Sequence, residues 1–255
     1  MTIAIIAAMQ EELELILKKI VNFNPITIGA YTFYQGQYQG HSVIVTLSGV
    51  GKVAAAGITG LLIGAFKDID IIIITGLAGA LDPTLKVGDV VISTQCIQHD
   101  VDARPNCKTK YQVPFSTAIF NANSELVVIA ERAVNTFLNS HLHEYIQEQD
   151  LALFNIEKPR YIAGVIATGD EFITDPKKLM SMRDDIQKVL GLAAVAIDME
   201  TTAVIAIAEA CQKPAVALRV ISDKGINDHY LQFKRTIAGQ YTVGMIEAFL
   251  QKLII

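Results

Sequence analysis

Residues 193–223 constrain the possible fold more than any other part of the chain. An apolar run ends in the acidic cluster Asp198-Met199-Glu200, a helix-period segment follows, and a second apolar run ends in Asp223. Strand, helix and strand in this order predict a right-handed crossover unit of a parallel sheet. The acids would then lie at the carboxyl ends of neighbouring strands, where open α/β sheets bind ligands. Carboxylates from two strands predict a reaction centre there.

Further secondary structure follows from hydrophobic periodicity and from glycine and proline positions. Short apolar or alternating runs predict strands, and an apolar residue every three or four positions predicts helices. The expected strands cover residues 2–8, 31–38, 42–47, 71–75, 90–93 and 161–167, and the expected helices cover 10–20 and 123–137. Residues 139–159 are polar and predict an elaboration on the outside of a single domain that spans residues 1–255.

Length and composition favour a protein that acts on small molecules. A chain of 255 residues fits one large α/β domain. The net charge of −5, with no basic block, argues against nucleic acid as a partner. No apolar run reaches the roughly 18 residues of a membrane-spanning helix, so we expect no membrane partner. The three cysteines have no metal-like spacing, and we interpret them as reduced thiols of a cytoplasmic protein.

Two motifs resemble cofactor or metal sites without meeting their requirements. Gly49, Gly51 and Ala54 follow a strand in the loose dinucleotide-binding pattern, but no acid ends the next strand about twenty residues on. We interpret this segment as a glycine turn that approaches a ligand, without NAD. The group at 99–102, with one histidine and two aspartates, lacks a further ligand at a recognisable spacing. We therefore expect a structural hydrogen-bond cluster there, no metal and no cofactor.

Six blocks in order carry a resemblance to a known family. They read AIIAAMQEEL, SGVGKVAAA, TGLAGALDPTLKVGD, TGDEFI, IDMETTA and RVISD. With these blocks, the chain resembles the 5'-methylthioadenosine/S-adenosylhomocysteine nucleosidases of the purine nucleoside phosphorylase superfamily. The resemblance runs essentially from end to end. It implies a three-layer α/β/α sandwich around a twisted mixed sheet, usually a homodimer, that hydrolyses the N-glycosidic bond of an adenine thionucleoside.

The resemblance also implies roles for single residues. Asp223 is similar to the acid that protonates adenine N7, Glu12 to the residue that activates water, and Glu200 to the residue that holds the ribose hydroxyls. Phe172 matches the aromatic residue stacked on adenine, and Ile173 matches the residue whose backbone reads the adenine edge. The other pocket positions that it implies are Met9, Val50, Leu77, Ala78, Gly79, Ile197, Met199, Arg219, Ser222 and Phe233.

The chemistry of glycosidic cleavage fits this assignment. Cleavage passes through an oxocarbenium-like state, so one group neutralises the leaving group and another delivers water from the opposite face. The purine leaves as an anion unless it is protonated, so Asp223 has to hold a proton near neutral pH. That requires a pKa raised by burial or by a hydrogen-bonded neighbour. From pattern alone, Glu12 is either a base that points over the edge of the sheet or a first-turn residue that compensates the helix dipole.

Alternatives concern the reaction and the 5'-substituent. Phosphorolysis needs a cationic phosphate site, and the first glycine turns hold Lys52 but no arginine, so hydrolysis is favoured. Leu77 replaces a small hydroxyl residue, and Asp198 replaces the usual glutamate. The loop at 103–114 lacks an expected aromatic near Asn106. Its basic residues Arg104, Lys108 and Lys110 suggest 6-amino-6-deoxyfutalosine as an alternative substrate. A nucleoside-binding sensor or storage protein is the non-enzyme alternative.

Overall fold

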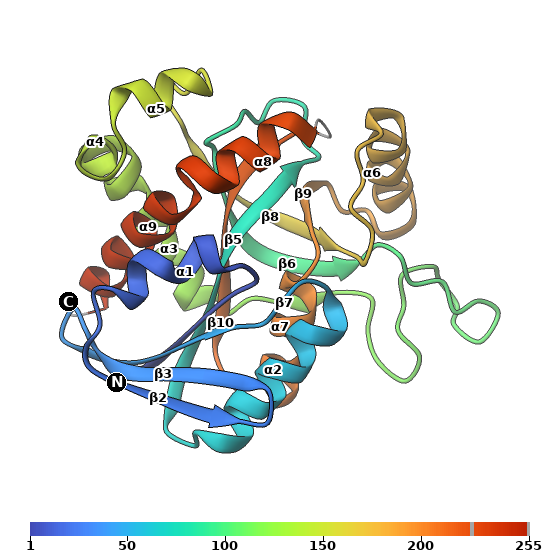
Figure 1. Cartoon of the computed structure of the whole chain (residues 1–255). Helices are drawn as coiled ribbons and strands as arrows, with labels where there is room; N and C mark the ends of the chain where they lie inside the picture. Colours follow the sequence, from blue (N-terminus) through green and yellow to red (C-terminus); the bar gives the residue numbers. More distant parts are fainter. Residues whose placement is uncertain (225–226, 254–255) are drawn as a thin grey trace.

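The computed structural model describes residues 1–224 and 227–253. Its described strands form one ten-stranded mixed sheet in the order β10-β6-β8-β9-β5-β1-β4-β3-β2, with β7 paired to β6 (Figure 1). β10 also pairs with β5, so this end of the sheet closes on itself. The strands are β1 (Thr2–Ala7), β2 (Val21–Ile28), β3 (Tyr31–Tyr38), β4 (His41–Leu47), β5 (Ile69–Ala80), β6 (Val90–Gln98), β7 (Phe120–Asn121), β8 (Tyr161–Thr168), β9 (Ala194–Asp198) and β10 (Ala215–Asp223).

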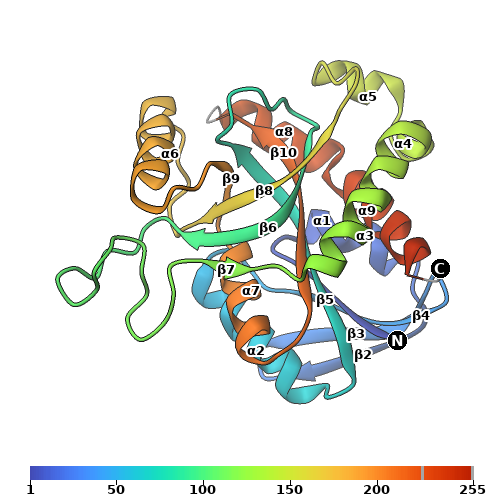
Figure 2. The ribbon, with the colours of Figure 1, turned by 180° about the vertical axis from the view of Figure 1, so that it is seen from behind.

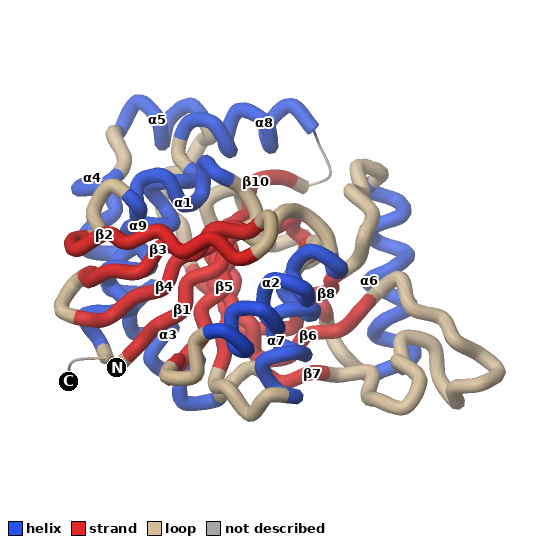
Figure 3. The backbone as a smooth tube through the Cα atoms, turned by 60° about the horizontal axis from the view of Figure 1, so that its bottom comes forward, coloured by secondary structure: helices blue, strands red, loops and turns tan. Residues whose placement is uncertain are grey.

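Helices cover both faces of the sheet (Figure 3). One face packs against α1 (Gln10–Leu17), α3 (Ser124–Thr136) and α9 (Ala238–Lys252), and the other against α2 (Lys52–Ala65) and α7 (Thr201–Ala210). The remaining helices are the π-helix η1 (Phe137–His141), α4 (Leu142–Tyr145), α5 (Glu148–Leu153), α6 (Pro176–Leu190) and α8 (Asn227–Thr236). The predicted three-layer class with a mixed sheet is confirmed.

The strand β1 shows why the sheet needs cover on both sides. Ile3 and Ile5 belong to the apolar cluster under α1 and α9, whereas Ala4 and Ile6 belong to the cluster under α2 and α7. Successive side chains of a strand point to opposite faces, so a continuous apolar run buries both.

Among residues 1–224 and 227–253, no helix combines the length and the apolar character needed to cross a bilayer.

The predicted crossover unit of β9, α7 and β10 is wrong in its pairing. β9 and β10 do not lie side by side, because both pair with β5. β10 runs parallel to β5, whereas β9 runs antiparallel to it at Gly79 and Ala80. The cause is the length of β5, which continues through the glycine-rich segment at 76–80 where a turn was expected. The carboxyl ends of β9 and β10 still meet, since both reach Gly79.

The segment at 139–159 and the strand β2 both depart from expectation. The segment exposes most of its polar residues, but it also buries Leu142 of α4, Leu151 of α5 and Phe154, which follows α5, in the core under α9. This segment is therefore part of the core as well as a surface elaboration. β2 was not predicted, because it is a mostly exposed edge strand that contains Pro25. A strand with neither face buried lacks the apolar alternation that identifies a strand. We infer a single domain, because one sheet spans the chain.

Candidate active site

A pocket opens where β5, β9 and β10 end. Its empty space, which is partly open to solvent, measures about 580 Å³. All the candidate residues from the sequence line it except Phe233. Four further residues line it: Ala8, Glu171 and Tyr230, which were not named as candidates from the sequence, and Asp198, which was named as part of the acidic cluster without a role of its own. Among the described residues, no group of three or more His, Cys, Asp or Glu side chains could hold a metal ion.

Glu12 reaches the pocket from the first turn of α1. Its Oε2 accepts hydrogen bonds from the backbone N–H groups of Ala8 at 3.0 Å and Met9 at 2.9 Å. Its Oε1 accepts from the N–H of Leu77 at 3.1 Å. A glutamate at this helix position commonly reaches back in this way, so the side chain caps α1 while it faces the pocket. Complete burial raises the pKa of Glu12 to about 7, although Arg219 opposes the shift.

Glu200 is held between a glycine turn and a cation. Its Oε1 accepts from the backbone N–H of Gly51 at 3.0 Å, and its Oε2 from Nη2 of Arg219 at 3.3 Å. Gly51 has a φ of +96°, a conformation that glycine adopts without a steric cost. The N–H of Gly51 therefore binds the carboxylate of Glu200, whereas the sequence predicts that this glycine turn approaches a ligand. Burial and the charge of Asp198 raise the pKa of Glu200.

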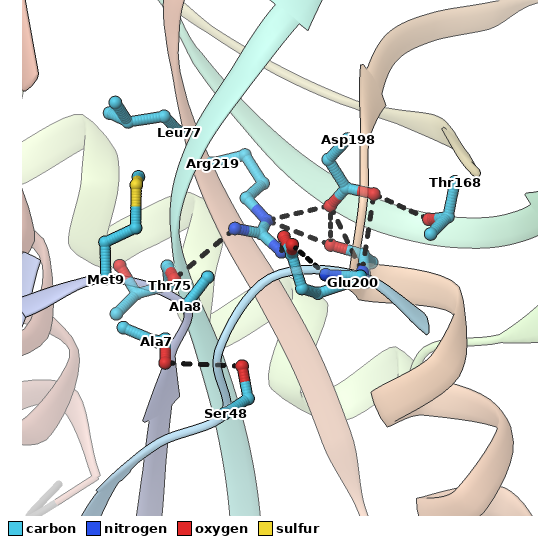
Figure 4. A network of polar contacts seen from close by, with 12 residues as sticks. Ala7, Ala8, Met9, Ser48, Thr75, Leu77, Thr168, Asp198, Glu200 and Arg219 are labelled. Atoms are coloured by element: carbon cyan, nitrogen blue, oxygen red, sulfur yellow. Dashed lines mark hydrogen bonds and ion pairs between the residues drawn. The ribbon is translucent and has the colours of Figure 1, made fainter. Parts of the chain in front are cut away.

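Arg219 is fully buried on β10 and organises the acidic side of the pocket (Figure 4). Its Nε donates to Oγ1 of Thr201 at 2.9 Å and lies 2.9 Å from Oδ2 of Asp198. Gly76 makes room for the guanidinium, since a Cβ at that position would lie 2.7 Å from Nη1 of Arg219 and 2.6 Å from Oε1 of Glu12. Any side chain at residue 76 would push these two groups apart.

Asp223 ends β10 beside Gly79, which explains its access to the pocket. The hydroxyl of Ser222 donates to Oδ2 of Asp223 at 2.9 Å, and the carboxyl group is largely buried. A Cβ at Gly79 would lie 3.5 Å from Oδ1 of Asp223 and 3.1 Å from Ile197. The bare backbone of Gly79 therefore borders both Asp223 and the pocket.

Two aromatic rings stand over the pocket. Phe172 is 45% exposed, and its ring centroid lies 5.0 Å from that of Tyr230. The Tyr230 hydroxyl lies 3.3 Å from the sulfur of Met9 and donates to it. Phe233, three residues further along α8, is fully buried and packs on Phe154. It lies in the core, whereas Tyr230 reaches the pocket from the same helix. No spacing in the sequence distinguished between these two aromatic residues.

The polar group at 99–102 contributes to the loops beside the pocket. Asp100 accepts from Nζ of Lys52 at 2.6 Å, and Asp102 pairs with Arg104 at 2.6 Å. Asp170 accepts from the backbone N–H of Lys52 at 2.7 Å. The contacts of Asp100 and Asp170 join the glycine turn to the loop that carries Phe172. Asp102 takes no part in this link, and Nε2 of His99 has no hydrogen-bond partner among the described residues, so of this group only Asp100 has the structural use that we expected.

Known proteins share this architecture over the whole chain. The family model for the phosphorylase superfamily matches residues 2–251. A 5'-methylthioadenosine/S-adenosylhomocysteine nucleosidase of Neisseria meningitidis, solved with methylthio-immucillin-A, is 29% identical, with 98% of each chain covered and a TM-score of 0.83. An S-adenosylhomocysteine nucleosidase of Streptococcus pyogenes is 30% identical, with coverage of 100% and 98% and a TM-score of 0.82. A futalosine hydrolase of Helicobacter pylori is 25% identical, with coverage of 97% and 96% and a TM-score of 0.77.

Proposed function

The chain belongs to the phosphorylase superfamily and, within it, to the 5'-methylthioadenosine/S-adenosylhomocysteine nucleosidases, and we propose that it hydrolyses the N-glycosidic bond of such adenine thionucleosides. As a member of that family it is a purine nucleosidase, an N-glycosyl hydrolase. The observation that carries the proposal is the meeting of Glu12, Glu200 and Asp223 in one pocket beside an exposed aromatic ring. They come from α1, from the turn after β9 and from the end of β10.

In the proposed mechanism the three carboxyl groups divide the work. Asp223 gives its proton to N7 of adenine, so that the purine leaves as a neutral base. Glu12 accepts a proton from the attacking water, and a pKa of about 7 suits a base at neutral pH. Glu200 accepts hydrogen bonds from the ribose hydroxyls, and these strengthen as positive charge develops on the sugar. Each proton transfer of this kind contributes about 10²- to 10⁴-fold to the rate.

The adenine ring would lie under Phe172, which offers its face for stacking. The backbone of Ile173 would read the edge of the base. Met9, Leu77 and Tyr230 would surround the 5'-substituent, because they line the same pocket as Glu12. Their apolar character supports a thioether in this position.

The glycine turn favours water over phosphate as the nucleophile. Phosphate sites in proteins use free backbone N–H groups and cations at such turns. Here the N–H of Gly51 is used by Glu200, the N–H of Lys52 by Asp170, and the Lys52 ammonium by Asp100. A phosphate ion would have to displace carboxylates that already occupy these donors. This supports hydrolysis over phosphorolysis.

The test is the release of adenine from 5'-methylthioadenosine, followed by chromatography with and without added phosphate. We expect release that ignores phosphate and yields free methylthioribose. Release that requires phosphate and yields a sugar 1-phosphate would make the chain a phosphorylase. A shift in melting temperature with adenosines but no release of base would support a nucleoside sensor or storage protein.

The futalosine-type alternative loses part of its support in the structure. Arg104 is paired with Asp102, and Lys110 lies 2.7 Å from Asp185, so two of the three basic groups already face carboxylates. An assay in which 5'-methylthioadenosine and 6-amino-6-deoxyfutalosine compete for the enzyme distinguishes the two substrate types. We expect a higher kcat/KM for the thionucleoside, and the reverse order would assign the enzyme to the futalosine type.

We further propose a cytoplasmic homodimer. Three free cysteines, two of them buried, support a reducing compartment. The outer face of α2 is apolar and formed by small residues, with Val53 85% exposed. The segment between β6 and β7 projects from the body and carries a fully exposed Phe115 (Figure 2). A contiguous apolar face such as that of α2 supports an interaction surface there. Light scattering should give twice the chain mass, and a monomer would contradict this proposal.

A further inference from the structure

Asp198 lines the pocket, yet its carboxylate is fully engaged with the protein. Its Oδ1 accepts from Oγ1 of Thr168 at 2.6 Å, and its Oδ2 lies 2.9 Å from Nε of Arg219. The N–H and the hydroxyl of Thr201 donate to it as well. The residue is only 6% exposed. A carboxylate held from so many sides is poorly placed to bind a substrate, so any effect on the reaction passes through its neighbours.

The neighbour that reaches the reacting groups is Arg219. Asp198 and Thr201 hold the Nε side of its guanidinium, while Nη2 donates to Glu200 at 3.3 Å. At Gly76 the same guanidinium approaches Glu12, because both groups would contact one added Cβ. Asp198 therefore fixes the position of a cation that touches one proposed reacting group and faces the other.

We propose that Asp198 is a positioning residue that acts through Arg219, orienting Glu200 and controlling the ionisation of Glu12. The proposal rests on the proposed function, which assigns these two glutamates their roles. One buried guanidinium faces three carboxyl groups, and burial disfavours the ionisation of two of them, Glu12 and Glu200. The negative charge of Asp198 partly cancels the positive potential that Arg219 produces at Glu12.

The charged groups around the cluster determine the direction of the effect. Glu12 faces Arg219 on β10, Glu200 after β9 and Tyr230 on α8, and Asp223 acts on the same tyrosine. Asp198 faces Arg219 and Glu200, and from the β6 side Cys96 and His99. Loss of its negative charge strengthens the field of Arg219 at Glu12. The pKa of Glu12 should therefore fall.

The experiment is the pH profile of kcat/KM for adenine release by Asp198→Asn. In the unmodified enzyme we expect activity to fall as pH drops below about 7, because Glu12 then binds a proton. In the variant this acid limb should move down by about one pH unit, so that at pH 5.5 activity relative to the plateau rises about tenfold. KM should rise at the same time, because Arg219, which donates to Glu200, is no longer held in place by the charge of Asp198.

Two controls separate charge from structure. Asp198→Glu keeps the charge and should keep the limb in place, even if KM changes. Asp184→Asn removes one exposed carboxylate on α6 and should change neither quantity.

An acid limb of Asp198→Asn that coincides with that of the unmodified enzyme overturns the proposal. If this variant does not fold, Asp198→Ser takes its place, and failure of both to fold would mark Asp198 as structural and also overturn the proposal. The proposed function fails differently: the unmodified enzyme would then release no adenine from any 5'-substituted adenosine.

Discussion

Glu12 and Glu247 are buried carboxyl groups on the packed helices α1 and α9, and their surroundings shift their pKa values in opposite directions. Glu247 accepts from the Tyr38 hydroxyl at 2.6 Å, from Nζ of Lys19 at 2.7 Å and from the Tyr145 hydroxyl. These donors hold its pKa below the ordinary value, although burial opposes them. Glu12 accepts only backbone N–H groups in the described structure, and its nearest cation is shared with other carboxylates.

The difference shows how one residue type serves stability in one place and chemistry in another. Glu247 has its own ammonium group, so it stays ionised and links α9 to β3 and α4. Glu12 shares the charge of Arg219 with Asp198 and Glu200, so its pKa stays near 7 and it can bind or release a proton at neutral pH. Buried carboxylates without full charge compensation are typical of functional sites. The following predictions test this contrast.

Asp223→Asn should have the largest effect on turnover. An asparagine cannot give a proton to the leaving purine, so kcat should fall by about 10²- to 10⁴-fold. Substrate binding should be largely kept, because the amide preserves the shape of the side chain. Steady-state kinetics together with equilibrium binding of adenine would measure both. Near-normal turnover would remove Asp223 from its proposed role.

Glu12→Gln should lower kcat by about 10²- to 10³-fold, because an amide cannot accept the proton of the attacking water. Its effect on the free energy of unfolding at pH 8 should be small. The variant avoids the cost of burying a charged carboxylate but loses an acceptor for the N–H of Leu77. A denaturant titration beside the kinetic assay would check this, and a stable variant with full activity would contradict the contrast.

Glu247→Gln should give the opposite result. Activity should remain within about twofold, while the free energy of unfolding should fall by about 1–3 kcal/mol, as for a lost hydrogen bond to a charged group. Urea unfolding followed by circular dichroism measures this loss. Tyr38→Phe, which removes one donor and keeps the charge pair, is the matched control and should cost less. A fall in activity well beyond twofold, with the free energy of unfolding unchanged, would assign Glu247 to the site.

The pH dependence of stability should separate the two carboxyl groups by sign. The pKa of Glu12 rises on folding, so its stabilising contribution is present below about pH 4.5 and is lost as pH rises through about 7. The pKa of Glu247 falls on folding, so its contribution is present above about pH 4.5 and is lost as pH drops below that value. The difference in the free energy of unfolding between the unmodified protein and each glutamine variant, measured from about pH 3 to 8, should show these opposite slopes, because each variant lacks the carboxyl group concerned.

Tyr230→Phe should have the smallest effect. The ring remains against Phe172, and only the hydrogen bond to the Met9 sulfur is lost. We expect KM to change by a few-fold and kcat to remain, because a sulfur acceptor is weak. Comparison of 5'-methylthioadenosine with S-adenosylhomocysteine would show whether the hydroxyl contributes to the choice of 5'-substituent. A large fall in kcat would instead bring Tyr230 close to the reacting atoms.

Pattern alone could predict part of the site, because Glu200 and Asp223 sit at the ends of apolar runs, whereas the role of Glu12 and the other pocket residues came from the resemblance to the nucleosidases. The apolar runs of β1, β5, β9 and β10 identify themselves by composition. Asp223 ends β10, Glu200 lies two residues after β9, and Glu12 lies in the first turn of the helix after β1. The roles of these residues remain proposals. Tyr230 and Phe233 show the limit of a pattern. Both are aromatic residues on one helix, and only the packing of α8 decides which of them enters the core.

Patterns along the chain are enough to predict the layered α/β class and the convergence of the acidic groups at one edge of the sheet. Local physics suffices here, because buried strands need continuous apolar runs and their ends must face solvent or a ligand. The strand pairing in three dimensions was needed to show that β5 continues to Ala80 and pairs with β9 and β10 on opposite sides. The tertiary structure also decided that Arg219 is shared among three carboxylates. Strand pairing and buried charge depend on partners distant in the chain, and no local pattern encodes those distances.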